Sequence, residues 1–555
     1  MPHDEERATA RHHMTRRVFV NSGLLGGALA VAEPFLPHLE FAQRTAEKSA
    51  FAPFELEEAT LRSLQDGMQS GKYTARKIVE AYLSRIDALN HRGPVLNQVL
   101  EINPEAFAAA DALDAERKAK GPRGPLHGIP ILLKDNIGTA DKMTTTAGSL
   151  ALAGSIPARD AFVAARLRHA GAILLGKTNM SEWANFRSTH SSSGWSGRGG
   201  QCRNPYALDR TPSGSSSGSA AAVAANLCAV AVGTETDGSV VSPSSACSIV
   251  GIKPTVGLIS RSGIIPIAHS QDTAGPMART VTDAAILLGA MTGVDLLDEA
   301  TDESAGKALN DYTRFLVPDG LRGARLGIAR SKFFDYNGAT VHLIESAIDV
   351  MKQQGAVIVD PADIATAGQF DDSEFEVLLY EFKADLNKYL AGLGPNAPVR
   401  SIKDIIEFNQ RNSAREMPFF GQEILLMAEK KGALDSEDYR KALAKDLEFS
   451  REKGIDATLE KHKLDAIVTP TAGPPPFTDL VNGDASFGSS STPAAVAGYP
   501  HITVPAGYVF GLPVGISFFG RPYSEPVLLK LAFSFEQATK HRRPPQFRAS
   551  AELPK

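Results

Sequence analysis

Short apolar runs alternate with helix-like patterns from about residue 55 onward, and this alternation most limits the folds that the chain can adopt. Runs such as Pro130–Lys134 and Ala172–Leu175 are continuously apolar, which is typical of strands buried on both faces. Apolar residues over 74–91 instead recur at helical spacing. The same patterns predict strands at 229–232, 326–329, 356–359, 465–468, 502–504 and 515–519, and helices at 220–225, 340–353 and 525–539. Such alternation predicts an α/β fold in which helices cover a largely parallel or mixed sheet.

Residues 370–460 depart from this pattern, because they are charged and helical and contain no evident strand. We interpret them as a peripheral helical subdomain. A chain of 555 residues could hold three or four domains of about 150 residues each. A single large α/β unit with a cap is also possible at this length.

The composition excludes several classes of protein. Hydrophobic residues make up 43% of the chain and charged residues 22%, which excludes a disordered chain or a coiled coil. The net charge of −5 argues against nucleic-acid binding, because neutralising phosphates requires a basic surface. Cys202, Cys228 and Cys247 are too few and too scattered for a disulfide framework or a Cys-rich zinc site. The composition favours a soluble enzyme with a packed core.

Residues 1–42 have the features of an export signal. Arg16 and Arg17 precede a weakly apolar run at 22–32, which is shorter than the roughly 20 apolar residues that span a bilayer. The run ends in Ala30-Val31-Ala32, which resembles a signal cleavage site, and the arginine pair indicates the twin-arginine type. An ordinary secretory signal or a disordered tail is the alternative, and Met14 could be the start. We therefore expect export to the periplasm, without stable membrane insertion after removal of the signal.

Two short motifs match known patterns weakly. Gly171–Thr178 has the spacing of a phosphate-binding loop, but its central Ala-Ile-Leu-Leu belongs to a predicted strand, whose ladder would use the backbone donors. Gly214–Gly218 matches G-x-S-x-G, which would make Ser216 the nucleophile of an α/β-hydrolase. That enzyme would also need a later histidine, for which the candidates are His269, His342, His462, His501 and His541.

A third group of residues is more informative. Lys134 ends an apolar strand, a Ser/Gly-rich loop follows at 211–219, and residues 233–239 follow another buried strand. Burial can lower the pKa of a lysine by several units, so that it can act as a base near neutral pH. Ser215 and Ser239 supply hydroxyls, and backbone N–H groups near residue 238 could hold an oxyanion. The residues alone leave open a plainer interpretation, in which Lys134 extends to the surface and the serines form turns.

At these positions the sequence resembles the amidase signature family over about residues 54–547. The similarity is densest at 210–255 and includes the sequence around Lys134. Within the family the chain is most similar to the peptide-amidase branch, which removes the amide from C-terminally amidated peptides. That similarity is carried by 181–187, 194–201 and 270–276.

The resemblance implies an α/β/α sandwich with a large mixed β-sheet, with residues 55–547 as the catalytic domain. It also implies a Ser-cisSer-Lys triad, in which Ser239 is the nucleophile, Ser215 is the bridging serine in a cis peptide and Lys134 is the general base. The oxyanion donors would be the backbone amides of Thr236, Asp237, Gly238 and Ser239. The family needs no metal or organic cofactor, and the sequence shows no cluster of metal ligands.

The chain departs from the usual family pattern at two positions. Ser213 and Ser217 stand where the family's loop has glycine, which removes backbone freedom there. Asp237 replaces a more usual glycine, as in the peptide-amidase branch. Its side chain could attract a cationic or donor group of the substrate, or it could turn into the protein.

The expected function is hydrolysis of a carboxamide, in a small molecule or a peptide, to a carboxylate and ammonia through an acyl-enzyme. The alternatives are an A-type chain of an aminoacyl-tRNA amidotransferase, an esterase that uses Ser216, and a non-catalytic binding protein on the same fold. The sequence does not identify the substrate or the oligomeric state.

Overall fold

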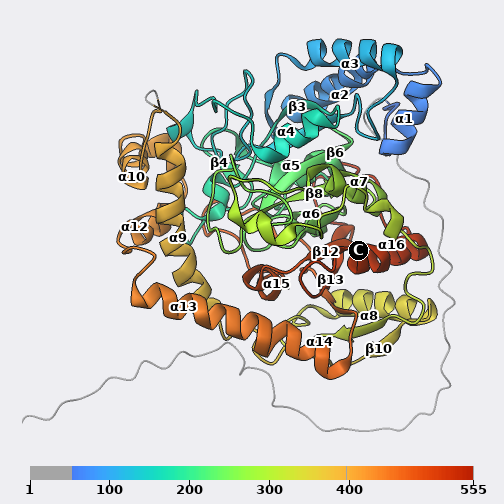
Figure 1. The fold of residues 1–555 in the computed structure, drawn as a ribbon, viewed down its shortest axis with the longest axis vertical. Coiled ribbons are helices and arrows are strands. Elements are labelled where there is room, and N and C mark those ends of the chain that lie inside the picture. The colour runs from blue at the N-terminus through green and yellow to red at the C-terminus, as the bar shows by residue number, and fades with distance from the viewer. Residues whose placement is uncertain (1–52, 395–396, 554–555) are drawn as a thin grey trace, which may run out of the picture. The chain divides into compact units, whose positions relative to one another are not determined.

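A computed structural model describes residues 53–394 and 397–553 of the chain (Figure 1). The predicted export signal at 1–42 lies outside these residues. The described residues belong to one compact unit, which includes the helices of 370–460.

In the described part of the chain, eleven strands form one sheet, in the order β1-β3-β2-β6-β8-β7-β12-β13-β11-β9-β10. The sheet is mixed, because β2 pairs in parallel with β3 and β6 whereas β6–β8 and β12–β13 are antiparallel. Its strands are β1 (Val99–Ile102), β2 (Pro130–Lys134), β3 (Ile173–Thr178), β6 (Val230–Glu235), β7 (Val250–Lys253), β8 (Thr273–Ala278), β9 (Arg325–Ile328), β10 (Val357–Val359), β11 (Ala466–Pro470), β12 (His501–Val509) and β13 (Leu512–Phe519). A separate small ladder joins β4 (Trp195–Ser196) to β5 (Gly200–Gln201).

Helices cover the sheet. Outside 370–460 they are α1 (Leu61–Gln69), α2 (Ala75–Ile86), α3 (Ala106–Lys120), α4 (Phe162–His169), α5 (Ser217–Ala224), α6 (Val241–Ala246), α7 (Val281–Met291), α8 (Gly338–Gln353), α15 (Thr492–Ala497) and α16 (Glu525–Thr539). Helices α4, α7, α16 and α8 contact one another in that order, and α5 packs against α6. Every residue of α5 is buried, and the hydroxyls of its Ser217 and Ser219 are hydrogen-bonded. The predicted α/β/α sandwich with a large mixed sheet is confirmed.

The pairing of β2 with β6 positions the candidate site. Leu133 lies beside Val232 in the parallel register, so both strands end at the same edge of the sheet. Lys134 is the last residue of β2, and the turn 236–239 follows β6 directly. Side chains at the carboxyl ends of neighbouring parallel strands meet at one edge, which is where α/β proteins usually bind ligands.

Residues 370–460 are helical, as predicted. They contain α9 (Asp371–Ala391), α10 (Ile402–Arg411), α11 (Ser413–Glu416), α12 (Glu423–Glu429), α13 (Glu437–Leu447) and the start of α14 (Asp456–His462). An apolar cluster joins α9, α10 and α12 to the rest of the unit, and it includes Leu378, Phe382, Leu386, Ile405, Leu425, Trp183, Phe186 and Ile267. This packing holds α9 beside the candidate site.

Three strands of the sheet are absent from the predicted set: β1, β7 and β8. Strand β8 reads Thr-Ala-Gly-Pro-Met-Ala, and glycine and proline normally argue against a central strand. Pro276 is accommodated beside Val232 in the antiparallel ladder with β6. None of the described helices is both long and apolar enough to cross a bilayer.

Candidate active site

Lys134 is completely buried at the end of β2, which excludes the surface position left open by the sequence. Its Nζ lies 2.7 Å from the Oγ of Ser215, 2.9 Å from the Oγ1 of Thr234 and 3.1 Å from the carbonyl oxygen of Thr234. The amide of Asn136 also donates to the Oγ1 of Thr234, at 2.9 Å. The amine of Lys134 therefore has three close partners and is shielded from bulk solvent.

Burial controls the protonation of this amine. Removal from water disfavours the charged form and lowers the pKa of Lys134 to about 7, although the charges of Asp272 and Glu235 partly oppose this effect. Lys134 can therefore release its proton near neutral pH, as its sequence context suggests.

Ser215 lies in the loop before α5. The Gly214–Ser215 peptide bond is cis, as the resemblance implies. Ser213 has a φ of +61°, the left-handed conformation for which the family's glycine is suited. The hydroxyl of Ser217 donates to the carbonyl oxygen of Ser213 at 2.6 Å. The hydroxyl of Ser217, which a glycine lacks, thus ties this loop to the start of α5.

Ser239 is the last residue of the turn that follows β6, and it is 8% exposed. The backbone N–H of Ser216 donates to its carbonyl oxygen at 3.1 Å, which joins the turn to the Ser215 loop. Gly238 has a φ of +76°, and a Cβ there would lie 2.8 Å from the Oγ of Ser491. Among the described residues, no group accepts a hydrogen bond from the backbone N–H of Asp237, Gly238 or Ser239. These N–H groups are available to an oxyanion.

Two buried acids fix the turn. The Oε2 of Glu235 accepts hydrogen bonds from the backbone N–H of Val240 at 2.7 Å and of Val241 at 3.0 Å, immediately after Ser239. Asp272 accepts from the hydroxyl of Thr236 at 2.6 Å. Sequence reasoning missed both acids. The Asp272 side chain comes from the loop before β8, so only the fold brings it to the turn.

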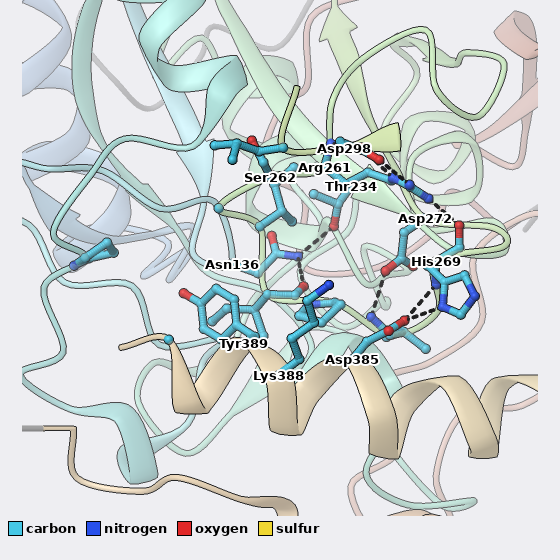
Figure 2. Close-up of a pocket in the computed structure, with 18 of the residues that line it drawn as sticks. Asn136, Thr234, Arg261, Ser262, His269, Asp272, Asp298, Asp385, Lys388 and Tyr389 are labelled. Atoms are coloured by element: carbon cyan, nitrogen blue, oxygen red, sulfur yellow. Dashed lines mark hydrogen bonds and ion pairs between the residues drawn. The ribbon is translucent and has the colours of Figure 1, made fainter. Parts of the chain in front are cut away.

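Two cavities meet at this turn and share Ala184, Thr236 and Ile267 as lining residues. The smaller one, of about 240 Å³, is also lined by Ser239, Asp237, Glu374 and Phe375. The larger one, of about 540 Å³, includes Asn136 and Thr234 beside Lys134. Figure 2 shows Asp385, Lys388 and Tyr389 of α9 facing this larger cavity.

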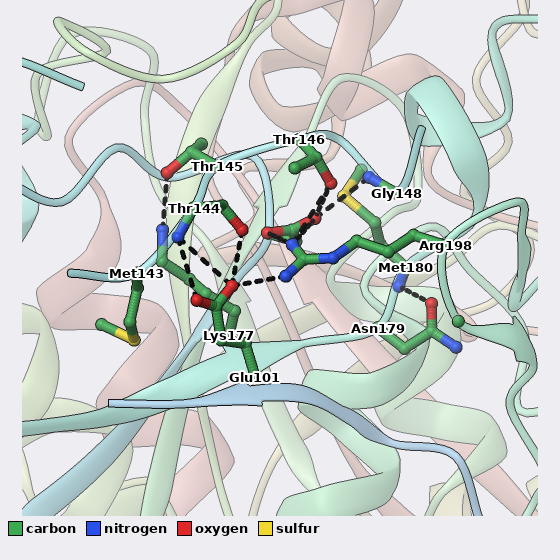
Figure 3. Close-up of polar contacts among 12 residues, drawn as sticks. Glu101, Met143, Thr144, Thr145, Thr146, Gly148, Lys177, Asn179, Met180 and Arg198 are labelled. Atoms are coloured by element: carbon green, nitrogen blue, oxygen red, sulfur yellow. Dashed lines mark hydrogen bonds and ion pairs between the residues drawn. The ribbon is translucent and has the colours of Figure 1, made fainter. Parts of the chain in front are cut away.

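A polar network supports the loop after β2 (Figure 3). The Asp135 carboxylate accepts from Arg198 at 3.1 Å and from the backbone N–H of Gly148 at 3.2 Å, and Arg198 also pairs with Glu101.

Lys177 is buried and donates to the hydroxyl of Thr145 at 2.8 Å. Because residues 173–178 form β3, the phosphate-loop spacing here is a strand, as predicted.

Ser216 is buried, and its hydroxyl donates to the carbonyl oxygen of Thr234 at 3.0 Å. Within residues 53–394 and 397–553, no histidine forms a hydrogen bond with it. The structure therefore does not assemble the hydrolase triad considered for Ser216.

The fold brings together one possible set of metal ligands that the sequence analysis did not find: His269, Glu381 and Asp385. The Nδ1 of His269 lies 2.8 Å from Asp385 and its Nε2 lies 3.3 Å from Glu381. Burial lowers the pKa of His269, but its hydrogen bond to Asp385 and the charge of Glu381 outweigh this effect and leave the pKa raised. Because both ring nitrogens face carboxylates, the contact is that of an imidazolium between two acids.

Comparisons with known proteins identify the family to which the chain belongs. The amidase family model matches residues 77–529. A probable amidase from Arabidopsis thaliana is 45% identical over 505 residues, which cover 89% of this chain and 92% of that protein. The A-type chain of the glutamyl-tRNA(Gln) amidotransferase from Alkalilimnicola ehrlichii is 34% identical over 502 residues, which cover 88% and 99% of the two chains.

Among solved structures, the native peptide amidase from Stenotrophomonas maltophilia has 50% sequence identity to this chain. Its TM-score is 0.86, and the match covers 89% of this chain and 100% of that one. The chain therefore belongs to the amidase signature family and is an amide-hydrolysing enzyme.

Proposed function

We propose that this amidase hydrolyses carboxamides to carboxylate and ammonia through an acyl-enzyme on Ser239. Ser215 relays the proton and Lys134 is the base. The single observation that carries the proposal is the distance of 2.7 Å between the Nζ of the buried Lys134 and the Oγ of Ser215. The link between Ser216 and Ser239 through the backbone supports the inclusion of Ser239.

The contacts of Lys134 suit a neutral amine. A neutral amine has two N–H donors and one lone pair, and Lys134 has three partners. The Thr234 carbonyl oxygen can only accept, and the Oγ1 of Thr234 also accepts from Asn136. Both N–H bonds of the amine can therefore point to Thr234, which leaves the lone pair to the hydroxyl of Ser215.

We infer the proton path from the contact between Lys134 and Ser215 together with the role that the family resemblance implies for Ser239. Lys134 takes the proton of Ser215 while Ser215 takes that of Ser239, and the Oγ of Ser239 attacks the amide carbon. The free N–H groups of residues 237–239 stabilise the oxyanion. The tetrahedral intermediate collapses as the proton returns through Ser215 to the departing nitrogen, which leaves as ammonia. Water then attacks the acyl-enzyme by the same relay and restores the three side chains.

We further propose that the substrates include C-terminal amides of peptides. The similarity to the peptide amidase of Stenotrophomonas maltophilia supports this assignment. Two adjoining cavities of about 540 and 240 Å³ meet at the turn and offer space for the residues on the acyl side of the reacting amide.

A second candidate is the A-type chain of an amidotransferase, because such a chain matches this one at 34% identity over nearly its whole length. Purification separates the two functions. An amidase hydrolyses amides as a single chain, whereas an amidotransferase chain would copurify with partner chains and depend on them.

The serine assignments can be tested by separate substitutions. We expect Ser239→Ala to abolish ammonia release from amidated peptides, because no other hydroxyl would form the acyl-enzyme. Lys134→Ala should cost more than the about 10²–10⁴-fold of ordinary acid–base help. Ser216→Ala serves as the control and should retain most of the activity. Loss of turnover in Ser216→Ala alone would favour the esterase mechanism and contradict the assignment.

The pH dependence follows from the pKa of Lys134. The base must be neutral, so kcat/KM should fall as the pH drops through about 7 and reach a plateau above it. Initial rates of ammonia release between pH 5 and 9 measure this limb. Lys134→Arg keeps a cation that cannot lose its proton, and should be inactive across the range. A flat profile in the wild-type protein would exclude a lysine base.

Gly238 allows a test of the turn. Gly238→Ala should lower kcat by at least about tenfold, because a Cβ at this φ would displace the N–H groups that hold the oxyanion. Gly338→Ala is the matched control, since a Cβ at that position meets no atom within 4 Å. Equal kcat values for the two variants would show that the turn does not need its observed geometry.

We also propose export by the twin-arginine pathway, on the pattern of Arg16 and Arg17. Replacement of both arginines by lysine should retain the protein in the cytoplasmic fraction, whereas the unaltered chain should reach the periplasm. An unaltered chain that stays in the cytoplasm would contradict export.

A further inference from the structure

Two carboxyl groups face the smaller cavity beside Ser239. Asp237 belongs to the turn itself, and Glu374 comes from the first turns of α9. They are far apart in the sequence, so only the packing of α9 against the unit places both acids around one cavity. Glu374 is 8% exposed.

These acids have few partners. The Oδ2 of Asp237 accepts from the hydroxyl of Thr492 at 2.6 Å, whereas its Oδ1 is buried without a hydrogen-bond partner in the described part of the chain. Glu374 accepts from the side chain of Gln271 at 2.9 Å through its Oε1. Neither acid forms an ion pair with any described lysine, arginine or histidine, although the charge of the buried Lys253 acts on Asp237.

Burial and like charge both disfavour the ionised forms of these two acids. Burial raises the pKa of Glu374 well above its ordinary value, and the charge of Asp237 raises it further. Burial also raises the pKa of Asp237, against the opposing effects of the hydroxyls of Ser491 and Thr492. Each of the two carboxyl groups disfavours the charge of the other. A cation in the cavity would stabilise their ionised forms, so the two acids form a site suited to a cation.

One part of the cavity wall is apolar, whereas Asn185, Thr236 and Ser239 line the remainder together with the two acids. The apolar part is formed by Ala184, Phe186, Ile267, Phe375 and Leu378. A volume of about 240 Å³ is below the about 300–1,000 Å³ of sites for drug-sized ligands, and is suited to one side chain. A group that fits both features has an aliphatic stem along the apolar wall and a positive charge at the acids.

We propose that this cavity selects amide substrates with a cationic side chain next to the reacting carboxamide, and that Asp237 and Glu374 are the specificity-determining residues. This inference rests on the proposed amidase function at Ser239. The sequence leaves two roles open for Asp237, which could attract a donor group of the substrate or turn into the protein. Each role describes one of its oxygens: Oδ2 bonds to the hydroxyl of Thr492, whereas Oδ1 is free for a donor.

The test compares N-acetyl-lysinamide with N-acetyl-norleucinamide. The two substrates differ only in the ammonium group at the end of the lysine side chain. For the wild-type protein we expect kcat/KM for lysinamide to exceed that for norleucinamide by about tenfold or more, the effect of one hydrogen bond to a charged group. Glu374→Gln keeps an acceptor for Gln271 but removes the charge, and should reduce this ratio severalfold.

Glu376→Gln is the matched control, because Glu376 lies on the same helix but pairs with Lys431 away from the cavity. It should leave the substrate ratio as in the wild type. Equal use of both amides by the wild-type protein, or a ratio that Glu374→Gln leaves unchanged, would overturn the inference.

Calorimetric titration of Ser239→Ala with the same two amides provides a readout that needs no turnover. Tighter binding of lysinamide would support the cationic site even if the wild-type protein released no ammonia. Absence of ammonia release from every amide would refute the proposed function, whereas hydrolysis without preference for the cation would refute only the selectivity.

Discussion

The close contact between the amine of Lys134 and the hydroxyl of Ser215 is the interaction on which the rest of the site depends. Proton transfer through this contact requires an amine without charge, and complete burial at the end of β2 lowers the pKa of Lys134 to about 7. The parallel pairing of β2 with β6 then places this amine beside Thr234 and near the turn that carries Ser239. The sheet therefore both creates the base and positions it.

The sequence predicts the sheet only where strands follow simple rules. Continuous apolar runs mark β2, β3 and β6, and α16 lies where a final helix near 525–539 is predicted. Strand β8 escapes prediction because its glycine and proline normally exclude a central strand, whereas its neighbours accept them here. A proline fits a central strand only where the neighbouring strand needs no backbone donor from that position, and the local sequence does not show where that is.

In the candidate site, too, some residues can be predicted from the sequence and others cannot. Lys134, Ser215 and Ser239 lie in recognisable motifs, and the fold brings Lys134 to Ser215 as the resemblance implies. Asp272, Glu374 and Gln271 carry no local signal, because their roles arise from contacts between segments far apart in the chain. Residues that belong to the chemistry can thus be found from sequence, whereas those that shape the cavity depend on how α9 packs.

The protonation of Lys134 is the most direct test of this account. The side-chain nitrogen signal of Lys134 can be followed from pH 5 to 9 in lysine-labelled protein and assigned by its loss in Lys134→Met. That assignment is needed because burial also lowers the pKa values of Lys177 and Lys253, to about 8. The account predicts a midpoint near 7 for Lys134. A signal that remains that of a charged ammonium up to pH 9 would contradict it.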